Sequence, residues 1–392
     1  MFELKKQPEP VDIKKYKTRA DNHSYVDNLG SINNGEAEDF LNVGIDMSEA
    51  ARSGTFIQKD ASIIHCNTKQ HGIDVMKISD AVKNDGQAEE HLWRSIPPDH
   101  DEFTVYAKEN PHEGYFIRAR KGVRCIDPVQ ACLHIATESF SQNVHNVVIA
   151  DEHSDIHIIT GCSTSSHLTR GLHVGVSEFY VKKGAVLRFT MIHDWGEKVD
   201  VRPRTVTVVE EGGIFISNYI SMNPVGSLQM NPVTLLNGEQ SVARFNSILV
   251  AGQGAHLDVG STVVLNEINS RAEIISRAIS TGGTIIARGN MTGKAEGIKA
   301  HLECKGLILK DGIMHAVPEL DARVPGVEMS HEAAVGRIDR REIEYLQSRG
   351  LDEDEAVSTI VRGFLNVDIE GLPPSLAAKL DKVVTATRKD AL

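Results

Sequence analysis

The sequence predicts a mainly β protein whose central part is a parallel β-helix, with an antiparallel sandwich or barrel as the alternative. From about 113 to 315, short β-branched and aromatic runs are punctuated by Gly, Asn, Asp and Lys. Glycines that open alternating strands recur at spacings close to multiples of fourteen, at Gly184, Gly213, Gly254, Gly283 and Gly297. Such a period favours stacked strand–turn units.

The composition limits the class of protein. The 392 residues include 42 basic and 54 acidic side chains, so the net charge is −12, and 41% are hydrophobic. The chain can therefore bury a core, and its acidity argues against nucleic acid or an anionic membrane as partner. The charged first residues and the absence of an 18-residue apolar run lead us to expect a cytoplasmic protein without signal peptide or membrane span.

The N-terminal region, 1–112, is predicted to be mixed α/β with short helices. Ser48 is the N-cap candidate of a helix over 48–52 that ends before Gly54. Further short helices are expected over 78–83 and over 89–95, the latter stopped by the two prolines at 97 and 98.

The core, 113–328, is predicted to contain strands throughout. The clearest β-rich runs are 146–150, 205–209, 214–218 and 283–287. No helix of convincing period lies between them, which disfavours alternating β and α units.

The C-terminal region, 329–392, is predicted to be helical. Asp339 with Glu342, and Asp352 with Glu355, have the spacing of capping boxes that begin two helices. A last amphipathic stretch, carrying Leu376, Leu380, Val383 and Val384, follows the prolines at 373 and 374. We therefore expect three short helices.

Five irregularly spaced cysteines and the absence of CxxC exclude a disulfide framework, a zinc ribbon and a thioredoxin-like site. Any bound metal must have ligands that are few, mixed in type or shared between chains. The P-loop, GxGxxG, GxSxG and HExxH motifs are also missing. The sequence therefore predicts a protein that does not hydrolyse ATP through a P-loop of its own.

Two stretches contain candidate metal ligands. His301-Leu-Glu303-Cys304 lies on an alternating strand, where Glu303 faces away from Cys304. The thiolate of Cys304 would suit iron–sulfur, copper or zinc; the alternative is a small buried apolar residue. His331 and Glu332 form an imidazole–carboxylate pair that could bind metal or act as base and orienter, unless they form a simple surface loop.

Cys162 is a candidate reactive thiol. It lies at the end of a strand, between Gly161 and Ser163, and such small polar neighbours leave a thiol accessible. An accessible thiol can become a persulfide or a transient disulfide, provided that its pKa is lowered. The alternative is an inert cysteine.

Read together, these residues resemble the SufB/SufD family of iron–sulfur cluster assembly scaffolds. The most specific match runs from His315 to Phe364 and consists of HAVPELDA, SHEAAVGRIDRREIEYLQSRGLDEDEA and IVRGF. A second set of matches is Pro128-Val-Gln-Ala131, Val147-Val-Ile-Ala-Asp151, Gly161-Cys-Ser163, Leu172-His173, Glu178 and Trp195. The similarity covers about 115 to 365.

The resemblance implies a right-handed parallel β-helix flanked by helical regions. It also implies a non-catalytic scaffold that forms dimers and binds one SufC-type ABC ATPase per protomer. The family's SufC-docking element corresponds to about 337 to 365, and the partner-binding candidates within it are Ile338, Ile343, Tyr345, Leu346 and Arg349. Sulfur donors and acceptor apo-proteins are the further partners that it implies.

The resemblance also assigns roles to individual residues. Cys304 matches the cluster-building cysteine of SufB, and Glu332 the neighbouring glutamate of SufB. His331 matches a histidine implicated in SufD. This chain thus carries the SufB-type residues Cys304 and Glu332 together with the SufD-like His331, which suits a homodimer that supplies both halves of the site. We expect these three residues of the two chains to face one another across the dimer and to bind a transient [2Fe–2S] or [4Fe–4S] cluster.

Cys162 matches the SufB cysteine implicated in accepting sulfur. The family's Gln-Asn-Trp stretch along the path inside the β-helix reads His193-Asp194-Trp195 here, so Trp195 alone is preserved. An Arg and an Asn near the point where sulfur enters correspond to His134 and Ala136. The sulfur relay is therefore expected to involve Cys162, His193 and Trp195 through a modified path.

Three other functions stay open on the sequence alone. The chain could be a SufD-like structural subunit, but the joint presence of Cys304 and Glu332 counts against this. It could be a β-helix enzyme such as a polysaccharide lyase, or an adaptor with vestigial sites. Iron binding would discriminate between a scaffold and an adaptor.

Overall fold

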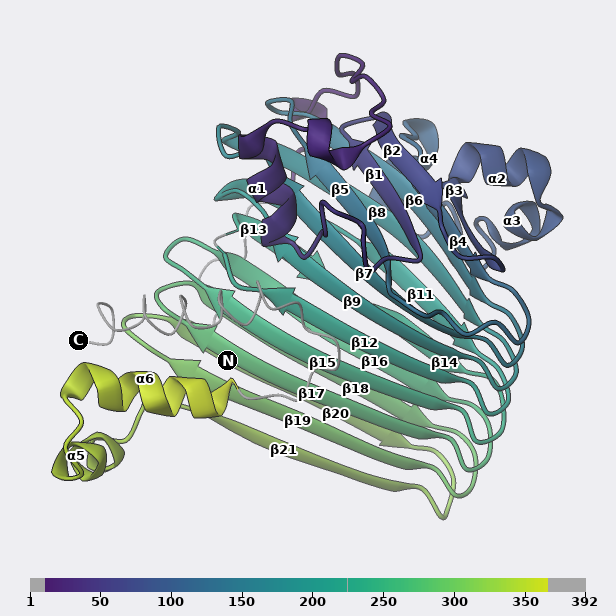
Figure 1. Cartoon of the computed structure of the whole chain (residues 1–392). Coiled ribbons are helices and arrows are strands. Elements are labelled where there is room, and N and C mark those ends of the chain that lie inside the picture. The colour runs from purple at the N-terminus through teal and green to yellow at the C-terminus, as the bar shows by residue number, and fades with distance from the viewer. Residues whose placement is uncertain (1–10, 224, 366–392) are drawn as a thin grey trace.

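The computed structural model describes residues 11–223 and 225–365. It consists of two long sheets that face each other and are built up strand by strand into a β-helix (Figure 1). The predicted amphipathic stretch after Pro373 and Pro374 lies outside the described residues. The predicted fold class, mainly β with a β-helix core and small flanking helical regions, is confirmed.

The chain alternates between the two sheets as it proceeds along the axis of the β-helix. The first sheet contains, in spatial order, β2 (Ser62–Thr68), β1 (Gly54–Lys59), β5 (Val129–Ile135), β7 (Asp155–Thr164), β9 (Val186–Asp194), β12 (Ile214–Ser221), β15 (Val242–Ala251), β17 (Arg271–Ser280), β19 (Lys299–Ile308) and β21 (Glu328–Gly336). The second contains β3 (Ile73–Lys77), β4 (Tyr115–Ala119), β6 (Ser141–Ala150), β8 (Arg170–Val181), β10 (Lys198–Val201), β11 (Arg204–Val209), β13 (Ser227–Met230), β14 (Val233–Leu236), β16 (His256–Leu265), β18 (Thr284–Gly293) and β20 (Ile313–Ala322). The strands from β5 onward pair in parallel.

The register explains the spacing of the glycines. Val242 pairs with Arg271, Arg271 with Lys299 and Lys299 with Glu328, so successive coils have nearly the same length. Each coil is close to twice the fourteen-residue unit that the glycine spacing suggested. Gly184 and Gly254 adopt φ of 64° and 81° in the turns, a conformation that glycine enters without steric cost.

The core lies between the two sheets. Alternate side chains of each strand point inward, and the aromatic rings of Phe179, Phe215 and Phe245 pack along the inside, with centroid distances of 6.2 and 5.8 Å between successive pairs. A second apolar layer covers the outer face of the first sheet, where Phe40 and Val357 contact residues of successive strands. The first sheet therefore packs against apolar side chains on both its inner and its outer face.

The N-terminal region differs in part from the prediction. The expected helix over 48–52 is a turn, because Glu49 adopts φ of 53° and its buried carboxylate accepts a hydrogen bond from Asn67. The helix expected over 89–95 is shifted toward the N-terminus and ends at His91. The short helices are η1 (Ile13–Lys15), η2 (Leu29–Ser31), α1 (Asn34–Asn42), α2 (Ile78–Asn84), α3 (Gly86–His91) and α4 (Glu102–Glu109), of which α2 is the one expected over 78–83.

Two helices follow the β-helix in the described part of the chain. Asp339 caps α5 (Arg340–Ser348), and Asp352 and Glu355 form the predicted capping box of α6 (Glu353–Phe364). The last strand, β21, continues to Gly336, past the boundary predicted at 329. Within the described residues, none of the helices is long and apolar enough to cross a membrane.

Candidate functional site

Cys304 lies on β19, in the last complete coil of the β-helix. Its side chain is buried and belongs to the inner core, while Glu303 points to the outer face, as the alternation predicted. Burial raises the pKa of the Cys304 thiol to about 11, opposed by nearby Arg277. The thiol is therefore protonated at neutral pH, and binding of a metal through its sulfur would require loss of this proton.

The two other predicted ligands, His331 and Glu332, lie on opposite faces of the neighbouring strand β21. On β21, His331 pairs with Leu302 and Ala333 with Cys304, so His331 lies on the same inner face as the thiol. Glu332 pairs with Glu303 and lies on the opposite face. Within one chain the structure therefore brings Cys304 and His331 onto one face but places Glu332 on the other.

Within residues 11–223 and 225–365, the inner face of β21 is left uncovered. β19 pairs with β21, which ends the first sheet, and His331, Ala333 and Val335 are exposed although they lie on the inner side. Cys304 is thus covered on one side by the packed core and lies one strand away from an uncovered end of the β-helix. The surface loop that was the alternative for His331 and Glu332 is wrong, because both residues lie on β21.

The outer face of β19 and β21 carries a polar cluster that was not predicted from the sequence. His301, Glu303 and Glu332 have ligand atoms within 4.8 Å of one another. Lys305 Nζ lies 3.1 Å from Glu303 Oε2 and 3.5 Å from Glu332 Oε1. The alternation of β19 placed His301 and Glu303 on one face, but their proximity to Glu332 depends on the register between two strands that are one full coil apart in the sequence.

Cys162 lies near the other end of the inner core. It is on β7, in register with His193 on β9, and both side chains are buried. Burial raises the pKa of the Cys162 thiol well above its usual range and lowers that of His193. The thiol is therefore neither accessible nor activated here, contrary to the accessible position considered from its small neighbours.

An aromatic group surrounds His193. The centroid of the His193 ring lies 5.4 Å from that of Trp195, and His193 Nδ1 is 2.8 Å from the Tyr219 hydroxyl. The His173 ring also packs against Trp195, with a centroid distance of 5.0 Å. The three predicted residues of the sulfur path are thus brought together inside the β-helix. His173 and Tyr219 were missed as members of this group, because they come from other strands.

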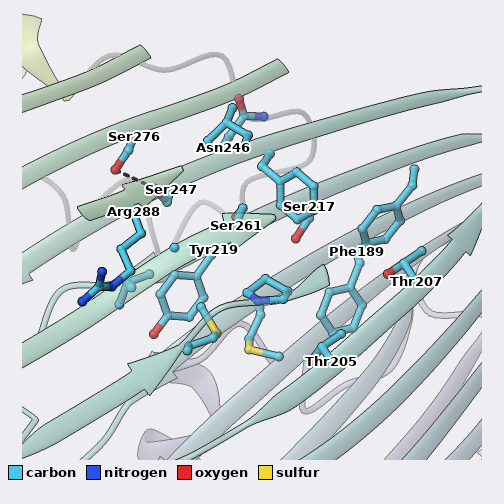
Figure 2. A pocket seen from close by; sticks show the side chains of 18 of the residues that line it. Phe189, Thr205, Thr207, Ser217, Tyr219, Asn246, Ser247, Ser261, Ser276 and Arg288 are labelled. Carbon is cyan, nitrogen blue, oxygen red and sulfur yellow. Dashed lines mark hydrogen bonds between the residues drawn. The ribbon is translucent and has the colours of Figure 1, made fainter. Parts of the chain in front are cut away.

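Hydroxyl groups continue from this aromatic group toward Cys304. The strand register aligns Tyr219, Ser247, Ser276 and Cys304 on successive inner positions. The Ser247 and Ser276 hydroxyls are 3.0 Å apart and form the hydrogen bond that is drawn as a dashed line in Figure 2. Tyr219 and the two serines line a cavity of about 40 Å³ that is otherwise largely apolar, with Phe189 on its wall.

The predicted partner-binding residues lie on both sides of α5. Ile338 and Ile343 pack partly against the apolar layer that covers the first sheet, and Leu346 is half-buried. Tyr345 is 57% exposed and its ring stacks with Arg349, whose guanidinium carbon lies 5.3 Å from the ring centroid. Tyr345 and Arg349 therefore remain available on the surface.

The comparisons with known proteins agree with this architecture. A family model described as "SUF system FeS cluster assembly, SufBD core domain" matches residues 133–364. The chain belongs to the SufBD family. The match includes the inner core from Cys162 to Cys304 and both C-terminal helices.

Relatives of this SufBD protein are similar over most of their length. An iron–sulfur cluster assembly SufBD family protein of Archaeoglobus fulgidus is 46% identical over 91% of this chain and 96% of its own. An iron–sulfur cluster assembly SufBD family protein of Methanothermobacter thermautotrophicus is 44% identical over 97% of this chain and 95% of its own. The iron–sulfur cluster assembly protein SufB of Bacillus subtilis is 30% identical over 85% of this chain and 73% of its own. A general role in iron–sulfur cluster assembly follows from this membership.

Proposed function

We propose that this SufBD protein is a cytoplasmic, non-catalytic scaffold subunit on which nascent iron–sulfur clusters are assembled at the interface of a homodimer. The observation that carries the proposal is the position of Cys304, an inward-facing thiol one strand away from the open end of the β-helix, with His331 on the same face. Thiolate and imidazole are both suitable iron ligands.

The open end supports the dimer. His331, Ala333 and Val335 face inward but are exposed, so a second copy that covers them would complete the interior. Two chains would then contribute a Cys304 and a His331 each. A transient cluster bound by few thiolates is released more readily than one bound by four cysteines, which suits a scaffold.

A SufC-type ABC ATPase is the partner that we assign to α5 and α6. The exposed Tyr345 and Arg349 would bind it, while Ile343 anchors the helix to the β-helix. Since α5 follows β21 directly, movement of the ATPase would act on the strand that carries His331. ATP hydrolysis could thus be coupled to exposure of the cluster.

We assign the sulfur relay to the interior. The Cys162 thiolate would attack the outer sulfur of a donor persulfide, so that a Cys162 persulfide forms and the donor leaves as a thiolate. The aligned hydroxyls of Tyr219, Ser247 and Ser276 provide hydrogen-bond donors along the way to Cys304. Because the pKa of the buried Cys162 thiol is raised, this step requires an opening or a base that activates the thiol. The sulfur donor would act at that opening, and the finished cluster would pass to apo-protein acceptors.

Anaerobic reconstitution with ferrous iron and sulfide tests the proposal. The native chain should develop a charge-transfer band in the visible range and bind iron, with an iron content per dimer that identifies a [2Fe–2S] or [4Fe–4S] cluster. Cys304→Ser should lose the band. Cys66→Ser, a partly buried cysteine on β2, is the matched control and should retain it.

A full band in Cys304→Ser would contradict the ligand assignment. A native dimer without any band, which still binds the ATPase, would instead support the SufD-like structural subunit. The outward position of Glu332, away from the thiol, is the observation that favours this second candidate. Anaerobic reconstitution of the native chain therefore discriminates between the cluster scaffold and the SufD-like structural subunit.

A further inference from the structure

The outer face of the last coils carries a second group of metal-binding side chains, separate from the inner thiol. His301 and Glu303 alternate with the inward-facing residues of β19, and Glu332 is in register with Glu303 on β21. The ligand atoms of these three residues lie within 4.8 Å of one another, although the residues are partly or fully exposed. The sheet therefore presents one imidazole and two carboxylates to the same point.

The histidine is oriented by its neighbour. Ser330 Oγ lies 2.9 Å from His301 Nδ1. In the tautomer in which Nδ1–H donates to this hydroxyl, the lone pair of Nε2 is free to bind a metal. A hydrogen bond to the second ring nitrogen is the usual support of a metal-binding histidine. Imidazole with carboxylates suits divalent first-row metals such as iron, manganese and cobalt, with water in the remaining positions.

A lysine occupies the position of a cation in this group. Lys305 Nζ contacts Glu303 at 3.1 Å and Glu332 at 3.5 Å, and Glu303 also pairs with Arg277. The two carboxylates thus already bind a positive charge between them. Because Lys305 is 31% exposed and its ammonium is on a flexible stem, a divalent ion can displace it into solvent.

The group is reached from solvent. His301 and Ser330 line a groove of about 860 Å³ that crosses β15, β17, β19 and β21. Arg244 and Lys299 lie on the same groove, each paired with a carboxylate. A hydrated ion therefore has an open path to the imidazole.

We propose that His301, Glu303 and Glu332 form a binding site for a divalent first-row metal ion, with Lys305 as its competitor. This outer-face site is distinct from the inner position of Cys304. Its use for holding ferrous iron before the iron meets sulfur rests on the proposed function, whereas metal binding itself does not. Glu332 belongs to the outer-face site within one chain, which accounts for its separation from the thiol.

Titration of the full-length chain with Co²⁺ tests the site. We expect visible d–d absorption without a thiolate charge-transfer band, and an unchanged spectrum in Cys304→Ser. Ser330→Ala should weaken binding about tenfold or more, as loss of a supporting hydrogen bond to a metal-binding histidine does. His301→Gln should weaken it further. His71→Gln, which changes an exposed histidine between β2 and β3, should bind as the native chain does.

Lys305→Met distinguishes a metal site from a simple polar cluster. Removing the competing ammonium should tighten Co²⁺ binding by about two- to fivefold, the worth of an exposed ion pair. Weaker binding in Lys305→Met, or native binding in His301→Gln, would overturn the assignment. Co²⁺ binding that requires Cys304 would overturn it too, while supporting the proposed cluster site.

Discussion

Histidines buried inside the β-helix, and His134 packed against Phe40 on the outer face of the first sheet, are held in their neutral forms. Burial lowers the pKa of His173 and of His134 to about 3, and it also lowers the pKa of His193 well below its usual range. In the unfolded chain each of these histidines titrates near 6.5. Between those values the unfolded chain binds more protons than the folded chain, so stability is present above pH 6.5 and is lost as the pH falls.

We therefore predict that the protein loses stability between pH 7 and pH 5. Each buried histidine should contribute a loss of about 2 kcal/mol at pH 5, one and a half units below the unfolded pKa. Thermal unfolding of the native chain and of His173→Gln, followed by circular dichroism across this range, measures the effect. The variant should show a smaller decrease, and identical pH curves would contradict the assignment.

Glu178 shows how a buried carboxylate can fix a distant segment. It accepts hydrogen bonds from the backbone N–H groups of Trp93 at 2.6 Å and Ser95 at 2.5 Å, and its Oε2 lies 2.8 Å from His145 Nε2. Trp93 adopts φ of 57°, an unfavourable conformation for a bulky residue. The carboxylate thus fixes the loop after α3 against β8, at the cost of some backbone strain.

Glu178→Gln should destabilise the protein by about 2 kcal/mol, because a hydrogen bond to a charged group is worth about 1.5–3 kcal/mol. Urea denaturation measures the change. Glu211→Gln, which removes an exposed carboxylate paired with Lys183, is the matched control and should cost less than about 1 kcal/mol. Equal losses in the two variants would show that the buried network is not important for stability.

The sequence predicted single-strand features better than contacts between strands. The opposite faces of Glu303 and Cys304 follow from alternation within one strand, and the structure has them. The outward position of Glu332 depends on its pairing with Glu303, one coil earlier in the chain, and no local pattern encodes that register. The depth of Cys162 was missed for the same reason, since the strands that bury it are distant in sequence.

The C-terminal helices were predictable as elements because their signals are local. Asp352 and Glu355 satisfy the first backbone N–H groups of α6 through a capping box that the sequence displays. Ser48 offers a similar signal, but the side chain of Glu49 accepts a hydrogen bond from Asn67 on β2, and the segment becomes a turn. Tertiary contacts outweighed helix propensity there.

At the level of α5, we predict that Tyr345→Ala weakens binding of the SufC-type ATPase by at least tenfold, because exposed aromatic residues are frequent interface anchors. The fold should be unaffected, since the apolar contacts of the helix pair come from Ile343, Val357 and Val361. A pull-down with titration of the purified ATPase measures the affinity. Tyr25→Ala, at 52% exposure in the N-terminal region, is the matched control; equal effects would argue against α5 as the docking element.

At the scale of the whole molecule, the β-helix is built by stacking of coils, and the described residues leave its β21 end uncovered. Val335 is 39% exposed although it faces inward over Gly306. We predict that Val335→Asp converts the proposed homodimer to a folded monomer, because it places a charge in the proposed interface without a partner. Light scattering after gel filtration gives the mass, and circular dichroism checks the fold.

Val105→Asp on α4, where the native side chain is 38% exposed, is the matched control for Val335→Asp and should remain dimeric. A native chain that is monomeric at micromolar concentration would contradict the dimer. So would a Val335→Asp variant that keeps the dimer mass.

The terminal position of β21 has a consequence for motion. Each coil of a stacked protein is stabilised by its neighbours, and among the described strands β21 has a neighbour, β19, on one side of its sheet. Amide hydrogens of 328–336 should therefore exchange with solvent faster than those of the interior strands, by local fraying that leaves the rest intact. His331 and Glu332 thus lie on a strand that we expect to open at a lower free energy than the interior strands, so a bound cargo could leave without unfolding the structure that holds Cys304.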